Sequence, residues 1–190
     1  MWPWEHLAFG YLVYSLGARA VGRHRLTALA VATLALGTQF PDLVDKPLGW
    51  GTTLLPSGLS LAHSLLFALP VAALTITVGA AVGRLAVALA FVTGYLTHLP
   101  GDVLYPLIVT GELRLGFLLW PLVPAADAST VAVLPYIGEL AARFLGFLQT
   151  PRGRLYLALE LALLGAASVR WYTDGLPGLR WLVGQRVTDR

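Results

Sequence analysis

The sequence predicts an all-α integral membrane protein, a polytopic helical bundle of about five or six membrane segments with one re-entrant or interfacial region. Of its 190 residues, 57% are hydrophobic and only 12% are charged, whereas soluble domains carry roughly 25% charged residues. The mean hydropathy is +0.72, and long apolar stretches recur along the chain. So few charges cannot cover a water-facing surface, which excludes both a soluble globular domain and an intrinsically disordered chain.

Four apolar segments come first, and each is a predicted helix. They run from about Glu5 to Ala20, from Leu26 to Phe40, from Ser60 to about Val82 and from Leu85 to Leu99. The second is expected to stop at Pro41, because residues 41–58 are rich enough in proline and glycine to predict a turn or loop. The third carries no charge between Ser64 and Gly83 and is the clearest membrane span, with a bend expected near Pro70.

After Asp102 the chain stays apolar but is often interrupted by proline, glycine and charge. Residues 103–124 are therefore predicted to form short interfacial or re-entrant pieces, since irregular backbone exposed to lipid is too costly. Two further helices are expected, at about Ser129 to Leu148 and Arg154 to Tyr172. The tail from Leu176 to Arg190 mixes apolar residues with arginines, which is typical of an amphipathic surface helix.

These segments predict a single membrane domain over residues 1–190. It comprises a four-helix core at 1–102, peripheral and re-entrant helices at 103–175, and an amphipathic basic tail at 176–190. The net charge of +3 comes from arginines that are spread singly and in pairs, as loop anchors are. We therefore expect membrane lipids as partners and no nucleic acid, while the oligomeric state stays open.

The basic loops orient the first four segments in the cell membrane. The positive-inside rule places the loop at Arg19 to Arg25 on the cytoplasmic side, and Arg84, two crossings later, falls on the same side. The start of the first and third segments and the end of the second and fourth then lie at the non-cytoplasmic face.

Those four helix ends carry three of the chain's four histidines and three aspartates. The six residues are His6, Asp42, Asp45, His63, His98 and Asp102. Ionisable groups at membrane depth cost roughly 2.5 to 3.5 kcal/mol each and are rarely kept without a partner or a function. A divalent cation would neutralise them, and because the chain has no cysteine, any metal must be held by imidazole and oxygen. We therefore predict one or two divalent metal ions, zinc first among the candidates, bound by these six residues.

Simpler interpretations exist for each residue. His63 and His98 are equally typical of hydrogen-bonded histidines in a bundle core, Asp42 of a helix cap, and Asp45 of a salt bridge to Lys46. His98 and Asp102 have the i,i+4 spacing that places two side chains on one helix face. Pro100 and Gly101 lie between them, however, so the helix is expected to kink or end there.

Four motifs, HLAFGYLVYS, GTQFPDLVDKP, LAHSLLFALP and GYLTHLPGD, together resemble the DUF457/YdjM-type membrane-bound proteins, which are described as metal-dependent hydrolases. The resemblance covers about residues 1–125. More distantly, the order His, Asp, His and H-x-x-x-D is similar to the first part of the zinc-dependent phospholipase C and S1/P1 nuclease pattern.

That distant similarity implies Asp42 or Asp45 with His63, His98 and Asp102 around one metal. It also implies His6 with a bridging Asp102 at a second. The chain departs from the pattern after Asp102, where it has no histidine, so the similarity implies one or two metal ions and no third.

The function expected from these observations is that of a membrane-embedded metal-dependent hydrolase. It would act on a phosphoester or other bond of an amphiphilic, lipid-like substrate at the outer membrane face, with Asp45 accepting a proton from the attacking water. Lys46, the only lysine, is expected to bind a phosphate, and Ser64 to contact the substrate. Snorkelling to headgroups and helix packing are the alternatives for these two.

Two other classes of protein stay open. One is a divalent-metal transporter or channel, in which the same ligands are a binding station. The other is a non-catalytic membrane scaffold with a structural metal site.

Overall fold

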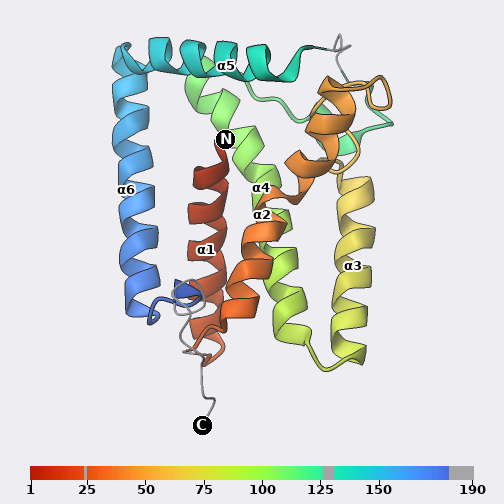
Figure 1. The fold of residues 1–190 in the computed structure, drawn as a ribbon, viewed down its shortest axis with the longest axis vertical. Coiled ribbons are helices and arrows are strands. Elements are labelled where there is room, and N and C mark those ends of the chain that lie inside the picture. Colours follow the sequence, from red (N-terminus) through yellow and green to blue (C-terminus); the bar gives the residue numbers. More distant parts are fainter. Residues whose placement is uncertain (24, 126–130, 180–190) are drawn as a thin grey trace. The chain divides into compact units, whose positions relative to one another are not determined.

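The computed structural model describes residues 1–23, 25–125 and 131–179, and every regular element within them is a helix (Figure 1). The elements are α1 (Pro3–Ala20), α2 (Ala28–Trp50), α3 (Leu65–Ala81), α4 (Leu85–Thr110), the 3-10 helix η1 (Gly116–Leu119), α5 (Val133–Leu148) and α6 (Pro151–Thr173). The predicted all-α class is confirmed.

Helix α2 continues through Pro41 and Pro47 to Trp50. The prediction that this helix stops at Pro41 and gives way to a loop was therefore wrong for residues 41–50. A proline inside a helix removes one backbone hydrogen bond and crowds the preceding turn, a cost that packing against neighbouring helices offsets. Pro41 is fully buried and lies in such packing.

Helix α4 likewise passes Pro100, Gly101 and Pro106 before it ends at Thr110. The helix therefore does not end between His98 and Asp102, and the irregular backbone predicted from residue 103 begins only after Thr110. Because the helix is continuous, the i,i+4 relation of His98 and Asp102 is preserved.

The remaining boundaries differ less from those predicted. Helix α3 begins at Leu65 rather than at Ser60, so His63 and Ser64 lie in the turn that precedes it. The start predicted for α5, at Ser129, and the tail beyond Leu179 lie outside the described residues.

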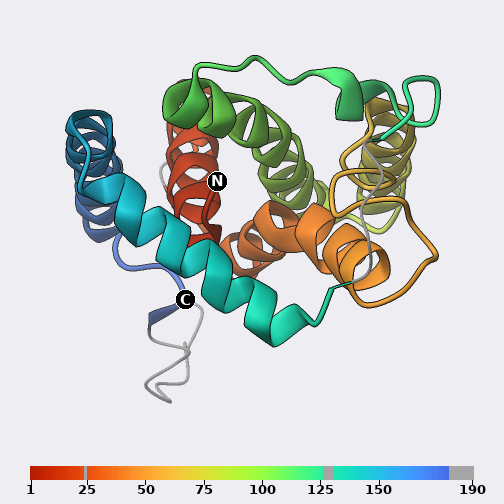
Figure 2. The same cartoon turned by 90° about the horizontal axis from the view of Figure 1, so that it is seen from above.

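The chain packs as two compact units, and α2, α3, α4 and α6 each contribute to both. The first comprises Met1, Phe40–Val71 and Leu99–Leu161, and the second Trp2–Gln39, Ala72–His98 and the described part of the chain from Ala162. In the second unit, α1, α2 and α4 lie side by side (Figures 1 and 2). Their core cluster consists of Tyr11, Ala30, Leu34 and Ala90.

Glycines let α2 and α4 approach closely in this second unit. A Cβ atom on Gly37 would lie 2.2 Å from the carbonyl oxygen of Phe91, and one on Gly94 would lie 2.4 Å from that of Leu34. Both obstacles are backbone atoms, which cannot move aside as a flexible side chain can. Small residues at such a crossing are typical of helix pairs in membranes.

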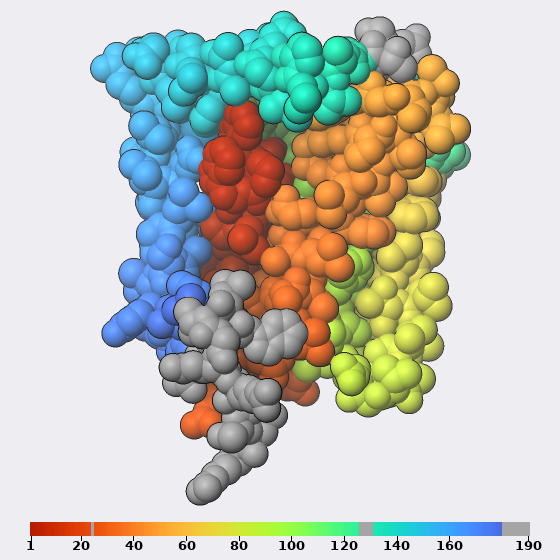
Figure 3. Space-filling view, in the orientation of Figure 1, coloured from red at the N-terminus to blue at the C-terminus, as the bar shows by residue number. Residues whose placement is uncertain are grey.

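Within the described residues, α4 is the one helix that is long and apolar enough to cross a membrane, and α3 is apolar but shorter. The expectation of about five or six membrane segments therefore stays a prediction. Large apolar side chains are nevertheless exposed on several helices. In Figure 3 helix α5, in cyan, is uncovered along its length, and none of its residues is buried.

Candidate metal centre

Asp45 holds together the turn that leads into α3. Its fully buried carboxylate accepts hydrogen bonds from the backbone N–H groups of Ser60 at 2.8 Å, of Ala62 at 2.9 and 3.1 Å, and of His63 at 3.2 Å. One of its oxygens also lies 2.8 Å from Nδ1 of His63. Since an ionised carboxylate only accepts hydrogen bonds, Nδ1 must carry a proton and donate a hydrogen bond to Asp45. Asp45 therefore fixes the orientation of the His63 ring.

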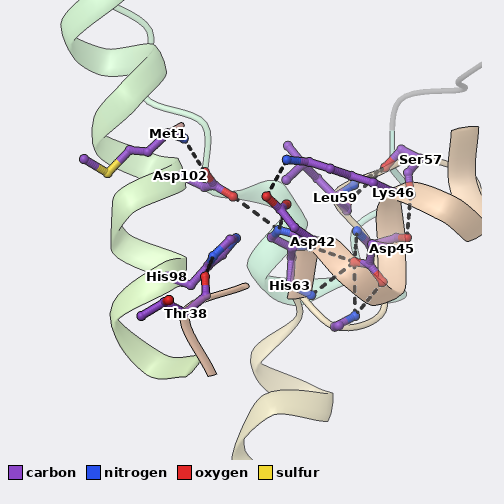
Figure 4. A network of polar contacts seen from close by, with 12 residues as sticks. Met1, Thr38, Asp42, Asp45, Lys46, Ser57, Leu59, His63, His98 and Asp102 are labelled. Carbon is purple, nitrogen blue, oxygen red and sulfur yellow. Dashed lines mark hydrogen bonds and ion pairs between the residues drawn. The ribbon is translucent and has the colours of Figure 1, made fainter. Parts of the chain in front are cut away.

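The other nitrogen of His63 faces two more carboxylates (Figure 4). Its Nε2 atom lies 3.4 Å from Oδ1 of Asp42 and 3.2 Å from Oδ2 of Asp102. A lone pair that faced two ionised carboxylates would be repelled by both, so a proton or a metal ion must lie between them.

The pKa of His63 reflects the same arrangement. Burial lowers it, but hydrogen bonds to the surrounding carboxylates, that of Asp102 first, raise it more, to about 10. His63 lies in the turn before α3, and the three carboxylates around its ring favour a positive charge there. A proton supplies that charge in the metal-free protein, and a divalent cation would replace it.

His98 is held by a different acceptor. It is fully buried on α4, and its Nδ1 atom lies 2.7 Å from the carbonyl oxygen of Thr38. Because a carbonyl oxygen cannot donate, Nδ1 carries a proton, which leaves Nε2 as the ring atom that can bind a metal ion. Metal-binding histidines typically donate the second ring N–H to a carboxylate or carbonyl in this way, and both His63 and His98 do so.

Four of the six predicted ligands converge. Asp42, His63, His98 and Asp102 each offer a ligand atom, and these atoms lie within 4.8 Å of one another. The continuous helix α4 sets His98 one turn before Asp102. Two imidazoles and two carboxylates, all largely buried, are a donor set that suits zinc and related divalent cations. This cluster could hold a metal ion.

The other two predicted ligands, Asp45 and His6, border this cluster of four, and their roles as ligands stay predictions. Both oxygens of Asp45 accept hydrogen bonds from N–H groups, so this residue orients His63 from the side opposite Asp42 and Asp102. The buried His6 stacks on His98, with ring centroids 3.7 Å apart and planes at 11°.

The two predicted substrate contacts also have partners within the protein. Lys46 forms an ion pair with Oδ2 of Asp42, one turn away on α2, and its Nζ atom lies 5.5 Å from the centre of the Trp50 ring. The Lys46 side chain is 29% exposed, so it lies at the edge of the cluster. The buried Ser64 hydroxyl donates to the carbonyl oxygen of Trp120 at 2.5 Å, which ties the segment after η1 to the start of α3.

The sequence interpretation missed three contributors. The Thr38 carbonyl could not be identified from the sequence, because every residue has a backbone carbonyl group. The amino group of Met1 donates to Asp102 at 2.6 Å, which spacing could not reveal. Trp50 follows Lys46 by four residues, a spacing that is informative only if the segment is helical, and that segment was predicted to be a loop.

The chain was compared with known protein families, with curated proteins and with solved structures. The family model described as YdjM inner membrane protein matches residues 1–175. Comparisons with curated proteins and with solved structures gave no match. The more distant similarity to phospholipase C and the nuclease pattern therefore gains no support from them.

Proposed function

This chain belongs to the YdjM inner membrane protein family, and on that premise we propose that it is a membrane-embedded, metal-dependent hydrolase of lipid-like phosphoesters. One observation carries the proposal. His63 and His98 both have Nδ1 bound to an acceptor, and their ligand atoms converge with those of two carboxylates. A histidine that only packs in a helix-bundle core does not need three carboxylates around its ring, as His63 has.

His63 and His98 would bind the ion through Nε2, and Asp102 through a carboxylate oxygen. Zinc is the metal we propose, since His and Asp ligands in a buried, compact cluster suit it. A catalytic zinc keeps one position open. Each carboxylate has one oxygen paired with a cation, Asp42 with Lys46 and Asp102 with the Met1 amino group. We assign Asp102 as the ligand because its other oxygen lies nearer to Nε2 of His63, at 3.2 Å against 3.4 Å for Asp42. When bound, the ion supplies a Lewis acid that polarises the scissile bond.

Asp42 takes the role that was predicted for Asp45. Its Oδ1 atom is on the side of His63 Nε2, whereas both Asp45 oxygens are held by N–H groups. Asp42 would accept the proton from water at Oδ1, while Lys46 holds Oδ2 and keeps the carboxylate ionised. The partly exposed Lys46 ammonium would also attract the substrate phosphate.

Metal analysis with matched variants tests this proposal. Protein is purified in detergent as wild type, His63→Ala, His98→Ala and Glu139→Gln. The last variant removes only an exposed ion pair to Arg143 and serves as the control. We expect bound zinc in the wild type and the control and its loss from both histidine variants. Hydrolysis of a panel of phosphodiesters, including phospholipids, should follow the metal content.

Each alternative has its own result. A bound metal without turnover of any substrate in the panel would overturn the hydrolase. Zinc uptake into proteoliposomes that depends on His98 would establish the transporter instead. A stable metal with neither activity would leave a structural site.

A further inference from the structure

An open apolar groove of about 390 Å³ lies in the second unit, between α2, α3 and α4. Leu74 and Val78 of α3 line one side, Val87 and Phe91 of α4 line another, and Thr33 of α2 closes it. The groove shares no residue with the metal cluster. Leu74 is 65% exposed and Val78 is 50% exposed, so the groove opens to the surroundings of the protein.

Helix packing explains why the groove forms there. A Cβ atom on Gly79 would lie 2.3 Å from the Cβ of Ala88, so α3 and α4 touch near the turn that joins them. The chain reverses at Gly83, whose φ of +70° favours glycine. On the other side, the Thr33 hydroxyl lies 3.3 Å from the carbonyl oxygen of Val87, and it also bonds to carbonyls within α2. The Thr33 hydroxyl is thereby satisfied and does not need a ligand.

Arg84 is the only charged residue in the groove lining. It lies in the turn between the end of α3 and the start of α4, and it is exposed. It forms no ion pair with any residue that the structure describes. The groove therefore combines an apolar slot with one uncompensated cation.

We propose that this groove binds one acyl chain of an anionic phospholipid, with the lipid phosphate held by Arg84. An apolar slot alone would accept any lipid chain. The guanidinium adds a preference for a headgroup with net negative charge, because the choline cation of a zwitterionic lipid offsets its own phosphate. Arginine presents parallel N–H groups that match two phosphate oxygens. Membership of an inner membrane protein family places the chain among such lipids.

Native mass spectrometry of the detergent-purified protein tests this assignment with phosphatidylglycerol and phosphatidylcholine of the same chains. The variants are Arg84→Gln, which keeps the slot, and Val78→Trp, which fills it. Arg154→Gln, an exposed arginine outside the groove, is the matched control. We expect the wild type to prefer phosphatidylglycerol. Arg84→Gln should weaken phosphatidylglycerol binding about fivefold and remove the preference, Val78→Trp should weaken both lipids, and the control should behave as the wild type.

Several results would overturn the proposal. One is an unchanged preference in Arg84→Gln, and another is unchanged binding of both lipids in Val78→Trp. Displacement of the lipid by inorganic phosphate alone would show a simple anion site. Loss of a dimer in Val78→Trp would show that a second copy of the chain occupies the groove. The thermal unfolding midpoint of the same samples reports folding, and their zinc content separates failure here from failure of the proposed hydrolase.

Discussion

Replacement of Asp45 by asparagine tests how the metal cluster is built. The Oδ2 atom accepts from the backbone N–H groups of Ser60, Ala62 and His63 and from the His63 ring, whereas Oδ1 accepts only from Ala62, at 2.9 Å. The best placement of the new amide thus puts its oxygen at Oδ2 and its NH2 group against the Ala62 N–H. The shorter of the two Ala62 hydrogen bonds is lost, and the remaining hydrogen bonds no longer end on a charged acceptor.

The expected effect on metal binding follows from that geometry. Removing a residue that orients a metal-bound histidine typically costs about 10- to 100-fold in affinity, equivalent to about 1.4 to 2.8 kcal/mol. Asp45→Asn should therefore still bind one zinc ion per site, but with an affinity weaker by that factor. The assay is competition with a chromophoric zinc chelator in detergent. His63→Ala should bind no zinc at this cluster.

A matched control is available in the second unit. Asp174 is equally buried, with 1% of its side chain exposed, and pairs with Arg19 and Arg170. Asp174→Asn should lower the thermal unfolding midpoint without changing zinc affinity. If Asp45→Asn bound zinc as tightly as the wild type, or lost it as completely as His63→Ala, the orienting role would be refuted. The second outcome would instead support direct ligation by Asp45.

Four further outcomes are expected. Gly94→Ala should destabilise the protein by about 1–3 kcal/mol in a thermal unfolding assay, because the new methyl group meets backbone atoms. Its control, Gly138→Ala, has no atom within 4 Å of the new methyl group and should be neutral or slightly stabilising. Since the pKa of His63 rises from 6.5 to about 10, its proton should stabilise the metal-free protein fully below pH 6.5, and that contribution should disappear as the pH rises towards 10. Zinc binding should release this proton, so calorimetry should show the apparent affinity falling about tenfold for each pH unit below 10. Lys46→Gln should keep the zinc content but raise KM for anionic phosphoesters about tenfold in steady-state assays, and an unchanged KM would place Lys46 outside the substrate site.

The amino-acid sequence was sufficient to predict the all-α class and the four residues that converge in the cluster. A chain with 12% charged residues has too few charges for a water-facing surface. Ionisable residues at the ends of its apolar segments therefore need polar or ionic partners. That reasoning selected six residues, and four of them converge. Composition and partner requirements do not depend on the details of packing, which is why they could be deduced in advance.

The course of the helices could not be deduced in this way. Pro41 and Pro100 are local signals for a helix end, but the tertiary packing around them keeps α2 and α4 continuous. This continuity turns a predicted loop into a helix that carries Asp42, Asp45 and Lys46. A local preference of a few kcal/mol is reversed when neighbouring helices supply comparable packing energy.

The roles of individual aspartates also depended on the tertiary structure. Asp42 and Asp45 are three residues apart and chemically identical, so nothing in the sequence distinguishes a metal-facing carboxylate from an orienting one. The distinction arises because the N–H groups of Ser60 and Ala62 reach Asp45, whereas Asp42 faces Nε2 of His63. Hydrogen-bond donors brought from distant parts of the chain decide which oxygen remains available to an ion, and only folding brings them there.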